Sequence, residues 1–207
     1  MQIWLVRHAS TSAQEEGRLQ GQLDFPLSAR GKEEAAKLAA RLKNEVEFSR
    51  IFSSNLKRAR DTAVLIAREG KKELEINYLP LLREYGWGVF EGLTWEEVAF
   101  IYPEQYRKIK RNYWRTYIPG RESRRGFISR VRALGRRVEY FPRAEKAILL
   151  VTHARLINAF ITHMIGGDLN QKWLYSPQPA SISVLERKPA TKDFDLINFN
   201  DCHHLNS

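Results

Sequence analysis

The chain has 207 residues, of which 43% are hydrophobic, and its formal net charge at pH 7 is +10. This length and apolar content suffice for one sizeable core, so we expect a single domain over residues 1–207. The only cysteine, Cys202, excludes an internal disulfide and favours a cytoplasmic protein. The first apolar stretch lacks a basic leader and no apolar run is long enough to span a bilayer, so we expect neither a signal peptide nor a membrane span.

Alternating strand-like and helix-like segments predict an α/β fold with a mostly parallel sheet. In chain order, the predicted elements are a strand at 2–7, a helix at 29–43, a strand at 50–53, a helix at 56–69, a short strand at 74–77, helices at 94–101, 103–115 and 122–141, a strand at 147–152, a helix at 155–165, and strands at 181–186 and 194–199.

Three of the predicted helices carry clear local signals. Ser28 is a predicted N-cap, and Thr94 begins a capping box that Glu97 completes. Apolar stripes at helical spacing predict the buried faces of the 29–43 and 122–141 helices. The first stripe consists of Ala35, Ala36, Leu38, Ala39 and Leu42, and the second of Phe127, Val131, Leu134 and Val138.

Charged side chains follow the ends of two apolar strands. The first strand ends in Arg7 and His8, and the strand at 147–152 runs into His153. The two strands look like parallel neighbours, whose carboxyl ends meet at the edge where open α/β folds bind ligands. We therefore expect Arg7 and His8 to be presented rather than buried, close to His153. A third strand-to-helix junction, at 51–63, adds a further arginine in the first turn of a helix.

Two histidines and two arginines in one pocket suit attack on a phosphoryl group. Guanidinium forks match phosphate oxygens in pairs and stay charged at any working pH. A neutral imidazole nitrogen can then attack phosphorus in line and form a phosphohistidine. For either histidine alone, an ordinary packed or solvated side chain is the commoner case, so the convergence of the three junctions carries the argument.

Matching segments of the chain occur in the order of one known family and span nearly the whole sequence. They are 5–9, 18–22, 24–31, 53–59, 62–63, 82–84, 88–92, 151–154 and 200–205. Through these segments the chain resembles the histidine phosphatase superfamily, also called phosphoglycerate mutase-like proteins. The resemblance implies a three-layer α/β/α fold with a mostly parallel central sheet. The long stretch before the 147–152 strand predicts a helical cap insertion at about 94–146.

The resemblance also implies the site residues. His8 matches the phosphorylated nucleophile, Arg7, Arg58 and His153 match the rest of the phosphate pocket, and Glu84 matches the proton donor. Further substrate contacts are expected from Thr11, Gln14, Gln20 and Gly21. This cycle uses neither a metal ion nor another cofactor.

Glu84 has two competing interpretations. A glutamate after an apolar run is commonly a surface residue, and the nearby Glu91 is another acid. However, Tyr85 and Trp87 crowd the same stretch, and partial desolvation favours the protonated carboxyl that a general acid needs. The motif places the acid at Glu84.

Three positions depart from the family pattern. Ala9 and Ala154 stand where glycine is commonest, and Gln14 stands where an asparagine often contacts phosphate. One extra methyl group should tighten the pocket slightly and leave activity intact. The hydroxyl of Thr11 is as readily an ordinary loop group as a substrate contact.

The predicted cap insertion is strongly basic. Its charges suit a solvated helical surface, or a patch that draws anionic substrates to the pocket. Nucleic-acid binding is the least favoured explanation, because no known binding module accompanies the charges. The basic residues are Arg107, Lys108, Lys110, Arg111, Arg115, Arg121, Arg124, Arg125, Arg130, Arg132, Arg136, Arg137 and Arg143.

Taken together, the residues and the resemblance predict a metal-independent phosphomonoesterase that acts on a small phosphorylated metabolite. The chain is too compact for the extra segments of the cofactor-dependent phosphoglycerate mutases, so hydrolysis is favoured over transfer and mutase activity is the alternative. Residues 114–123 and 200–205 are similar to α-ribazole phosphatases and to broad-specificity bacterial phosphatases, which makes α-ribazole 5'-phosphate one candidate substrate. The non-enzyme alternative is an inactive binding module that uses the basic cap, and a homodimer is left open.

Overall fold

A mostly parallel sheet forms the centre of the molecule. The computed structural model describes residues 1–142, 144–170, 176–189, 191 and 193–206. Within these residues the sheet has six strands in the order β3-β2-β4-β1-β5-β6. Pairing is parallel from β3 to β1, and β5 pairs antiparallel with both β1 and β6, which confirms the predicted sheet. The strands are β1 Gln2–Arg7, β2 Arg50–Ser53, β3 Ile76–Tyr78, β4 Ala147–Thr152, β5 Ile182–Arg187 and β6 Phe194–Asp201.

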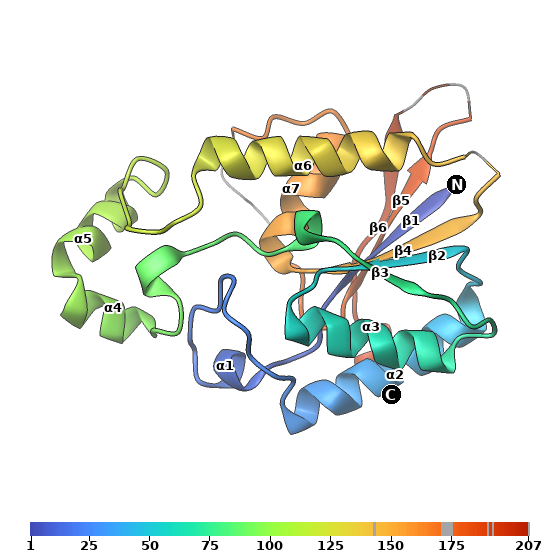
Figure 1. Cartoon of the computed structure of the whole chain (residues 1–207), viewed down its shortest axis with the longest axis horizontal. Helices are drawn as coiled ribbons and strands as arrows, with labels where there is room; N and C mark the ends of the chain where they lie inside the picture. Colours follow the sequence, from blue (N-terminus) through green and yellow to red (C-terminus); the bar gives the residue numbers. More distant parts are fainter. Residues whose placement is uncertain (143, 171–175, 190, 192, 207) are drawn as a thin grey trace.

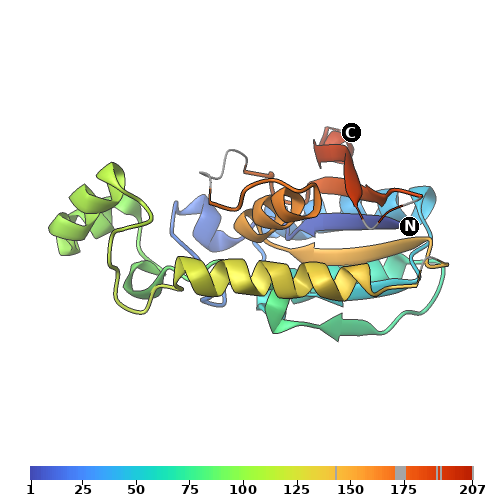
Figure 2. The ribbon, with the colours of Figure 1, turned by 90° about the horizontal axis from the view of Figure 1, so that it is seen from above.

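Helices cover both faces of this sheet, as Figures 1 and 2 show. Helices α2 and α3 pack against Val6 and Leu149, whereas α6 and α7 pack against Leu5 and Leu150. Successive strand residues point to opposite faces, so an apolar strand serves both helical layers. The expected three-layer α/β/α fold is confirmed. The α-helices are α1 Ser12–Glu15, α2 Ala29–Glu45, α3 Lys57–Glu69, α4 Trp95–Ile101, α5 Pro103–Arg111, α6 Arg124–Glu139 and α7 Ala154–Met164.

Local signals set the starts of the helices, with a few differences from expectation. Ser28 caps α2, and Thr94 forms the expected capping box with Glu97 at the start of α4. In α2, however, Ala36 is exposed and Glu34 is buried in its place, because the carboxylate of Glu34 binds the backbone N–H and the hydroxyl of Ser10. Helix α1 was not expected, and β3 begins at Ile76 rather than near residue 74.

The expected insertion at 94–146 divides into two parts. Helices α4 and α5 project at the left of Figure 1 and pack with Trp87 and Phe90 in a small cluster of their own. Helix α6 instead lies in the outer layer of the main fold, because its apolar face packs on the sheet. Helix α5 ends at Arg111 rather than near residue 115. The chain turns after this end, and the hydroxyl of Thr116 donates to the carbonyl oxygen of Asn112.

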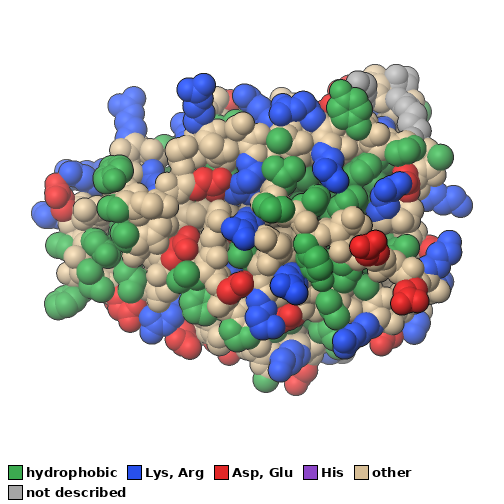
Figure 3. Space-filling view, in the orientation of Figure 1, with side chains coloured by type: hydrophobic (Ala, Val, Ile, Leu, Met, Phe, Trp, Pro, Cys, Tyr) green, Lys and Arg blue, Asp and Glu red, His purple; other side chains and the backbone are tan. Residues whose placement is uncertain are grey.

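The basic residues of this region do not form one continuous patch on the face shown in Figure 3, where Lys and Arg lie among acidic and apolar side chains. Some are paired, as Lys108 is with Glu104 and Arg130 with Glu122. Arg143 lies outside the described residues. Among the described residues, no helix is both long enough and apolar enough to cross a membrane.

Candidate active site

The three strand-to-helix junctions meet at the carboxyl edge of the sheet. Strands β1 and β4 are parallel neighbours with Arg7 opposite Thr152, so the residues that follow them lie side by side. The ring centroids of His8 and His153 are 5.1 Å apart. Arg58, in the first turn of α3, places its Nε 3.3 Å from Nε2 of His8. The structure thus brings together groups that are far apart in the sequence.

Both histidines are buried, which corrects the expectation that His8 would be presented. His8 exposes 3% of its surface and His153 none. The loop after α1 covers this edge, since Arg58 donates hydrogen bonds of 2.7 Å to the carbonyl groups of Gly21 and Leu23. A strand end marks the edge of a sheet, but the loops that fold over it decide the exposure.

A cavity of about 790 Å³ nevertheless reaches His8. Its wall contains Arg7, His8, Arg58, Glu84 and further polar and aromatic side chains. His153 lies beside His8 but does not belong to the wall. The cavity is much larger than one phosphate group, so it has room for the alcohol portion of an ester.

Hydrogen bonds orient the imidazole of His8. Its Nδ1 lies 2.8 Å from the carbonyl oxygen of Ala9, which can only accept, so Nδ1 carries the proton. Nε2 then has a lone pair, and the Nε–H of Arg58 points to it. This is the tautomer that a nucleophilic imidazole needs.

Burial and positive neighbours keep both histidines neutral. Desolvation, with the charges of Arg58 and Arg7, holds the pKa of His8 well below its ordinary value of 6.5. The pKa of His153 is lowered in the same way, first by burial and then by Arg58. Burial also lowers the pKa values of Arg7 and Arg58 to about 10, so both guanidiniums stay charged at neutral pH.

We predict that these lowered pKa values make folding stability depend on pH. Below pH 6.5 the unfolded chain protonates its histidines while buried His8 and His153 stay neutral, so stability is present above pH 6.5 and is lost as the pH falls. Each such group contributes about 1.4 kcal/mol per pH unit. Urea unfolding at several pH values should therefore give a shallower slope for His153→Gln than for the unmodified chain, and equal slopes would contradict the prediction.

Glu84 lies at the cavity with its carboxylate held by backbone groups. Oε1 accepts from the N–H of Tyr85 at 2.8 Å, and Oε2 accepts from the N–H of Arg155 at 3.3 Å. Glu91 has a different environment, because its Oε1 accepts from the N–H groups of Gln22 and Trp87 and it is absent from the cavity wall. Glu84 therefore lines the cavity, and Glu91 does not.

Three of the four other predicted binding residues line the cavity, and Thr11 does not. Gln14, Gln20 and Gly21 belong to the cavity wall. Thr11 is fully buried as the N-cap of α1, where its hydroxyl accepts from the N–H of Gln14 and its own N–H donates to the Gln14 side chain. Its hydroxyl is therefore committed to a capping box and does not line the cavity.

The alanines in the glycine positions fit without backbone strain. Ala9 is fully buried, and its N–H donates to the hydroxyl of Thr62. Neither Ala9 nor Ala154 is among the described residues with a positive φ. A glycine is required instead at Gly31, where the backbone packs closely against Ser10. A Cβ at this position would lie 1.8 Å from the carbonyl oxygen of Ser10. That contact and the carboxylate of Glu34 hold the loop that follows His8.

Sequence reasoning missed several residues around the cavity. Arg155 is in the wall, and its guanidinium lies 4.6 Å from the centre of the Trp87 ring. Its position in the first turn of a helix after a strand-end histidine was an available signal. Ser54 binds Nε2 of His153 at 2.8 Å, and no local pattern distinguishes it from neighbouring Ser53. Tyr113, Trp114 and Asn170 also belong to the wall, as do Lys110 and Arg111 of the predicted basic set.

A buried pair of histidines with Arg7 and Arg58 beside them, at the carboxyl edge of a mostly parallel sheet, is an arrangement suited to a phosphoryl group. The comparisons with known proteins agree. The family model for the histidine phosphatase superfamily (branch 1) matches residues 3–200. The chain belongs to this superfamily.

Individual relatives cover nearly the whole chain. It is 32% identical to phosphoserine phosphatase 1 of Hydrogenobacter thermophilus, over 98% of this chain and 94% of that protein. It is 30% identical to the adenosylcobalamin/alpha-ribazole phosphatase of Escherichia coli, over 90% of each. The crystal structure of the alpha-ribazole phosphatase from Shigella flexneri is similar with a TM-score of 0.85 and 29% identity, over 98% of this chain and 97% of the other.

Proposed function

We propose that the chain hydrolyses small phosphomonoesters through a phosphohistidine formed on His8. The chain is a phosphomonoester hydrolase of its family, and the observation that carries the proposed mechanism is the state of its first histidine. Nδ1 of His8 is tied to the carbonyl group of Ala9, and Nε2 keeps a lone pair that meets the guanidinium of Arg58. A bound phosphoryl group would take over the N–H of Arg58 and leave Nε2 in line with phosphorus.

Two buried nitrogen atoms near His8 support this proposal. Nε of Arg7 and Nδ1 of His153 are buried and make no hydrogen bond within the described part of the chain. Ser54 can donate its hydroxyl proton to Nε2 of His153, which leaves the proton of that ring on Nδ1. Phosphoryl oxygens would satisfy both nitrogen atoms, and donors of this kind stabilise the charge that develops during transfer.

Glu84 supplies the proton steps. As Nε2 of His8 bonds to phosphorus and the ester P–O bond breaks, the protonated carboxyl of Glu84 gives its proton to the leaving alkoxide. The resulting carboxylate then takes a proton from water, whose oxygen attacks phosphorus and breaks the P–N bond. Inorganic phosphate leaves, and both His8 and Glu84 return to their starting states. The proposed cycle uses the side chains of His8 and Glu84 together with water.

The physiological substrate is a finer question. The printed names of the relatives include phosphoserine and α-ribazole phosphatases, so both esters are candidates here. We place the enzyme in the cytoplasm, where small phosphorylated metabolites occur. Phosphoglycerate mutase activity is the second candidate, because one relative from Escherichia coli is named a probable phosphoglycerate mutase. The combination of Arg7, His8, Arg58, Glu84 and His153 disfavours the inactive binding module.

The proposal predicts that the protein releases phosphate from p-nitrophenyl phosphate in the presence of EDTA. His8 and the two arginines supply the nucleophile and the positive charge, so chelation should leave the rate unchanged. A panel of natural esters, including phosphoserine and α-ribazole 5'-phosphate, should then be compared by kcat/KM. Transfer to an acceptor alcohol without phosphate release would favour the mutase. Loss of activity in EDTA that returns on adding a metal would overturn the proposed mechanism.

A further inference from the structure

The segment that carries Glu84 has no regular structure of its own. It lies between two short 3-10 helices, η1 (Pro80–Leu82) and η2 (Gly88–Phe90), and residues 83–86 belong to no helix or strand. Its backbone carbonyl groups therefore need partners from elsewhere in the fold. Those partners determine where the carboxyl group of Glu84 lies.

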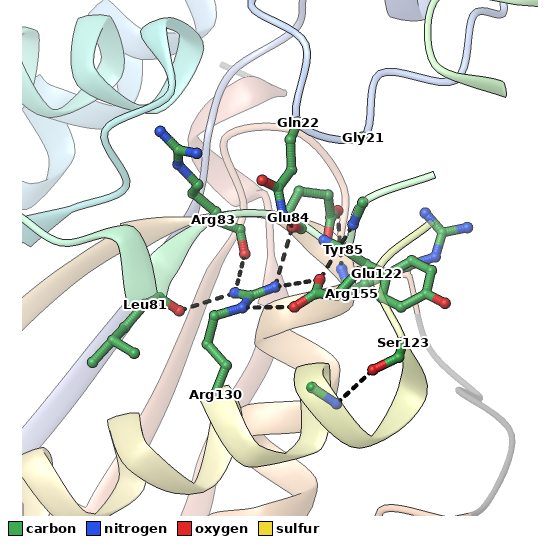
Figure 4. A network of polar contacts seen from close by, with 12 residues as sticks. Gly21, Gln22, Leu81, Arg83, Glu84, Tyr85, Glu122, Ser123, Arg130 and Arg155 are labelled. Carbon is green, nitrogen blue, oxygen red and sulfur yellow. Dashed lines mark hydrogen bonds and ion pairs between the residues drawn. The ribbon is translucent and has the colours of Figure 1, made fainter. Parts of the chain in front are cut away.

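One guanidinium binds three carbonyl groups of this stretch, and the side chain of Gln22 also donates to the carbonyl oxygen of Glu84, at 3.1 Å. Arg130, on α6, donates to the carbonyl oxygens of Leu81 at 3.1 Å, Arg83 at 2.6 Å and Glu84 at 3.2 Å. Figure 4 shows the Arg130 head group between this segment and Glu122. A single side chain thus binds three carbonyl groups within four consecutive residues.

Glu122 binds the other edge of the same guanidinium and also holds the segment directly. Its Oε1 accepts from Nε of Arg130 at 3.0 Å, and its Oε2 accepts from Nη2 at 2.7 Å. Oε2 also accepts from the N–H of Gly86 at 3.3 Å, and the N–H of Glu122 donates to the carbonyl oxygen of Gly86. The pair is largely buried, with side-chain exposures of 14% for Arg130 and 18% for Glu122.

The bonding uses the donor capacity of an arginine in full. A guanidinium has five N–H groups, and Arg130 makes five hydrogen bonds, two from Nη1, two from Nη2 and one from Nε. Lysine has three donors and no planar fork, so it cannot reproduce this pattern. Neither Arg130 nor Glu122 belongs to the cavity wall, so neither contacts a ligand there.

We propose that Arg130 and Glu122 are a positioning pair for the general acid. They hold the backbone of residues 81–86 so that the Glu84 carboxyl meets the leaving oxygen of the ester. Glu84 itself links this backbone to the site, because its carbonyl oxygen accepts from Arg130 while its carboxylate accepts from the N–H of Arg155. The inference rests on the proposed role of Glu84 and adds two residues that act through it.

The test compares leaving groups in single-turnover formation of the phosphohistidine. Displacement of the acid by about 1 Å can cost about 10²-fold, so Arg130→Lys should slow an alkyl phosphate by about that factor. It should slow p-nitrophenyl phosphate much less, because p-nitrophenolate leaves without a proton. Glu122→Gln removes the negative charge beside Arg130 and keeps the size of the side chain. It should show the same leaving-group dependence. Inhibition by inorganic phosphate should stay unchanged in both variants.

Arg132→Lys is the matched control, because Arg132 lies on the same helix and is exposed. Equal slowing of both substrates by Arg130→Lys and Glu122→Gln, as a merely structural role would give, overturns the positioning pair. Glu84→Gln is measured alongside. If Glu84→Gln discriminates between leaving groups and the other two variants do not, only the pair is rejected. If Glu84→Gln also slows both substrates equally, Glu84 is not the general acid, and the proposed positioning pair is rejected as well.

Discussion

His8→Ala is expected to abolish turnover while the protein still folds and binds phosphate. Removal of the nucleophile leaves no group that can accept the phosphoryl group, so we expect a loss of about 10³-fold or more. Arg7 and Arg58 remain, and their charges should keep the affinity for inorganic phosphate nearly unchanged. The measurement is steady-state release of phosphate, with calorimetry or inhibition for binding.

The unmodified protein should also show an acid-labile, alkali-stable phosphoryl label that His8→Ala lacks. His163→Ala serves as the control, because that histidine is on α7 and outside the cavity wall. It should keep both the label and the activity. A folded His8→Ala protein that retained more than a few per cent of normal turnover would exclude His8 as the nucleophile.

The second large effect is expected for Glu84→Gln with substrates that have poor leaving groups. An alkoxide needs a proton as the P–O bond breaks, so formation of the phosphohistidine from an alkyl phosphate should slow by about 10²–10⁴-fold. The same step with p-nitrophenyl phosphate should slow much less. Single-turnover measurement is required, because loss of the base would make hydrolysis of the intermediate limiting for every substrate.

Glu91→Gln is the informative comparison for this acid. Its carboxylate binds the N–H groups of Gln22 and Trp87, so its replacement should affect stability more than chemistry. Any loss of rate should be similar for the two leaving groups. If Glu84→Gln slowed both substrates equally, Glu84 would not be the acid, and a leaving-group dependence in Glu91→Gln would move that role to Glu91.

Some features of the site followed directly from local patterns. The apolar strands at 2–7 and 147–152 predicted neighbouring strand ends, and β1 and β4 are indeed parallel neighbours with both histidines at the same edge. Continuous apolar runs and helical spacing are properties of short segments, so they can be read without knowing the rest of the fold. The caps at Ser28 and Thr94 are local in the same sense.

Other features depended on contacts between distant segments, which no local pattern encodes. The 18–23 loop decided that His8 is buried, and a capping box rather than a ligand took the hydroxyl of Thr11. Similarly, α6 was expected in a cap but packs on the sheet, because its apolar stripe shows only that one face is buried and not against what.

The sequence by itself determined the fold class, the edge of the sheet where the two histidines lie, and the residue types that suit a phosphoryl group. Only the tertiary structure decided the tautomer of His8 and the different environments of the Glu84 and Glu91 carboxylates. It also decided the contacts that Arg130 and Glu122 make with residues 81–86. The physical reason is that hydrophobic periodicity selects a face, whereas hydrogen-bond partners are selected by three-dimensional proximity. A charged residue such as Arg130 is one of many on its helix until the fold sets three carbonyl groups beside it.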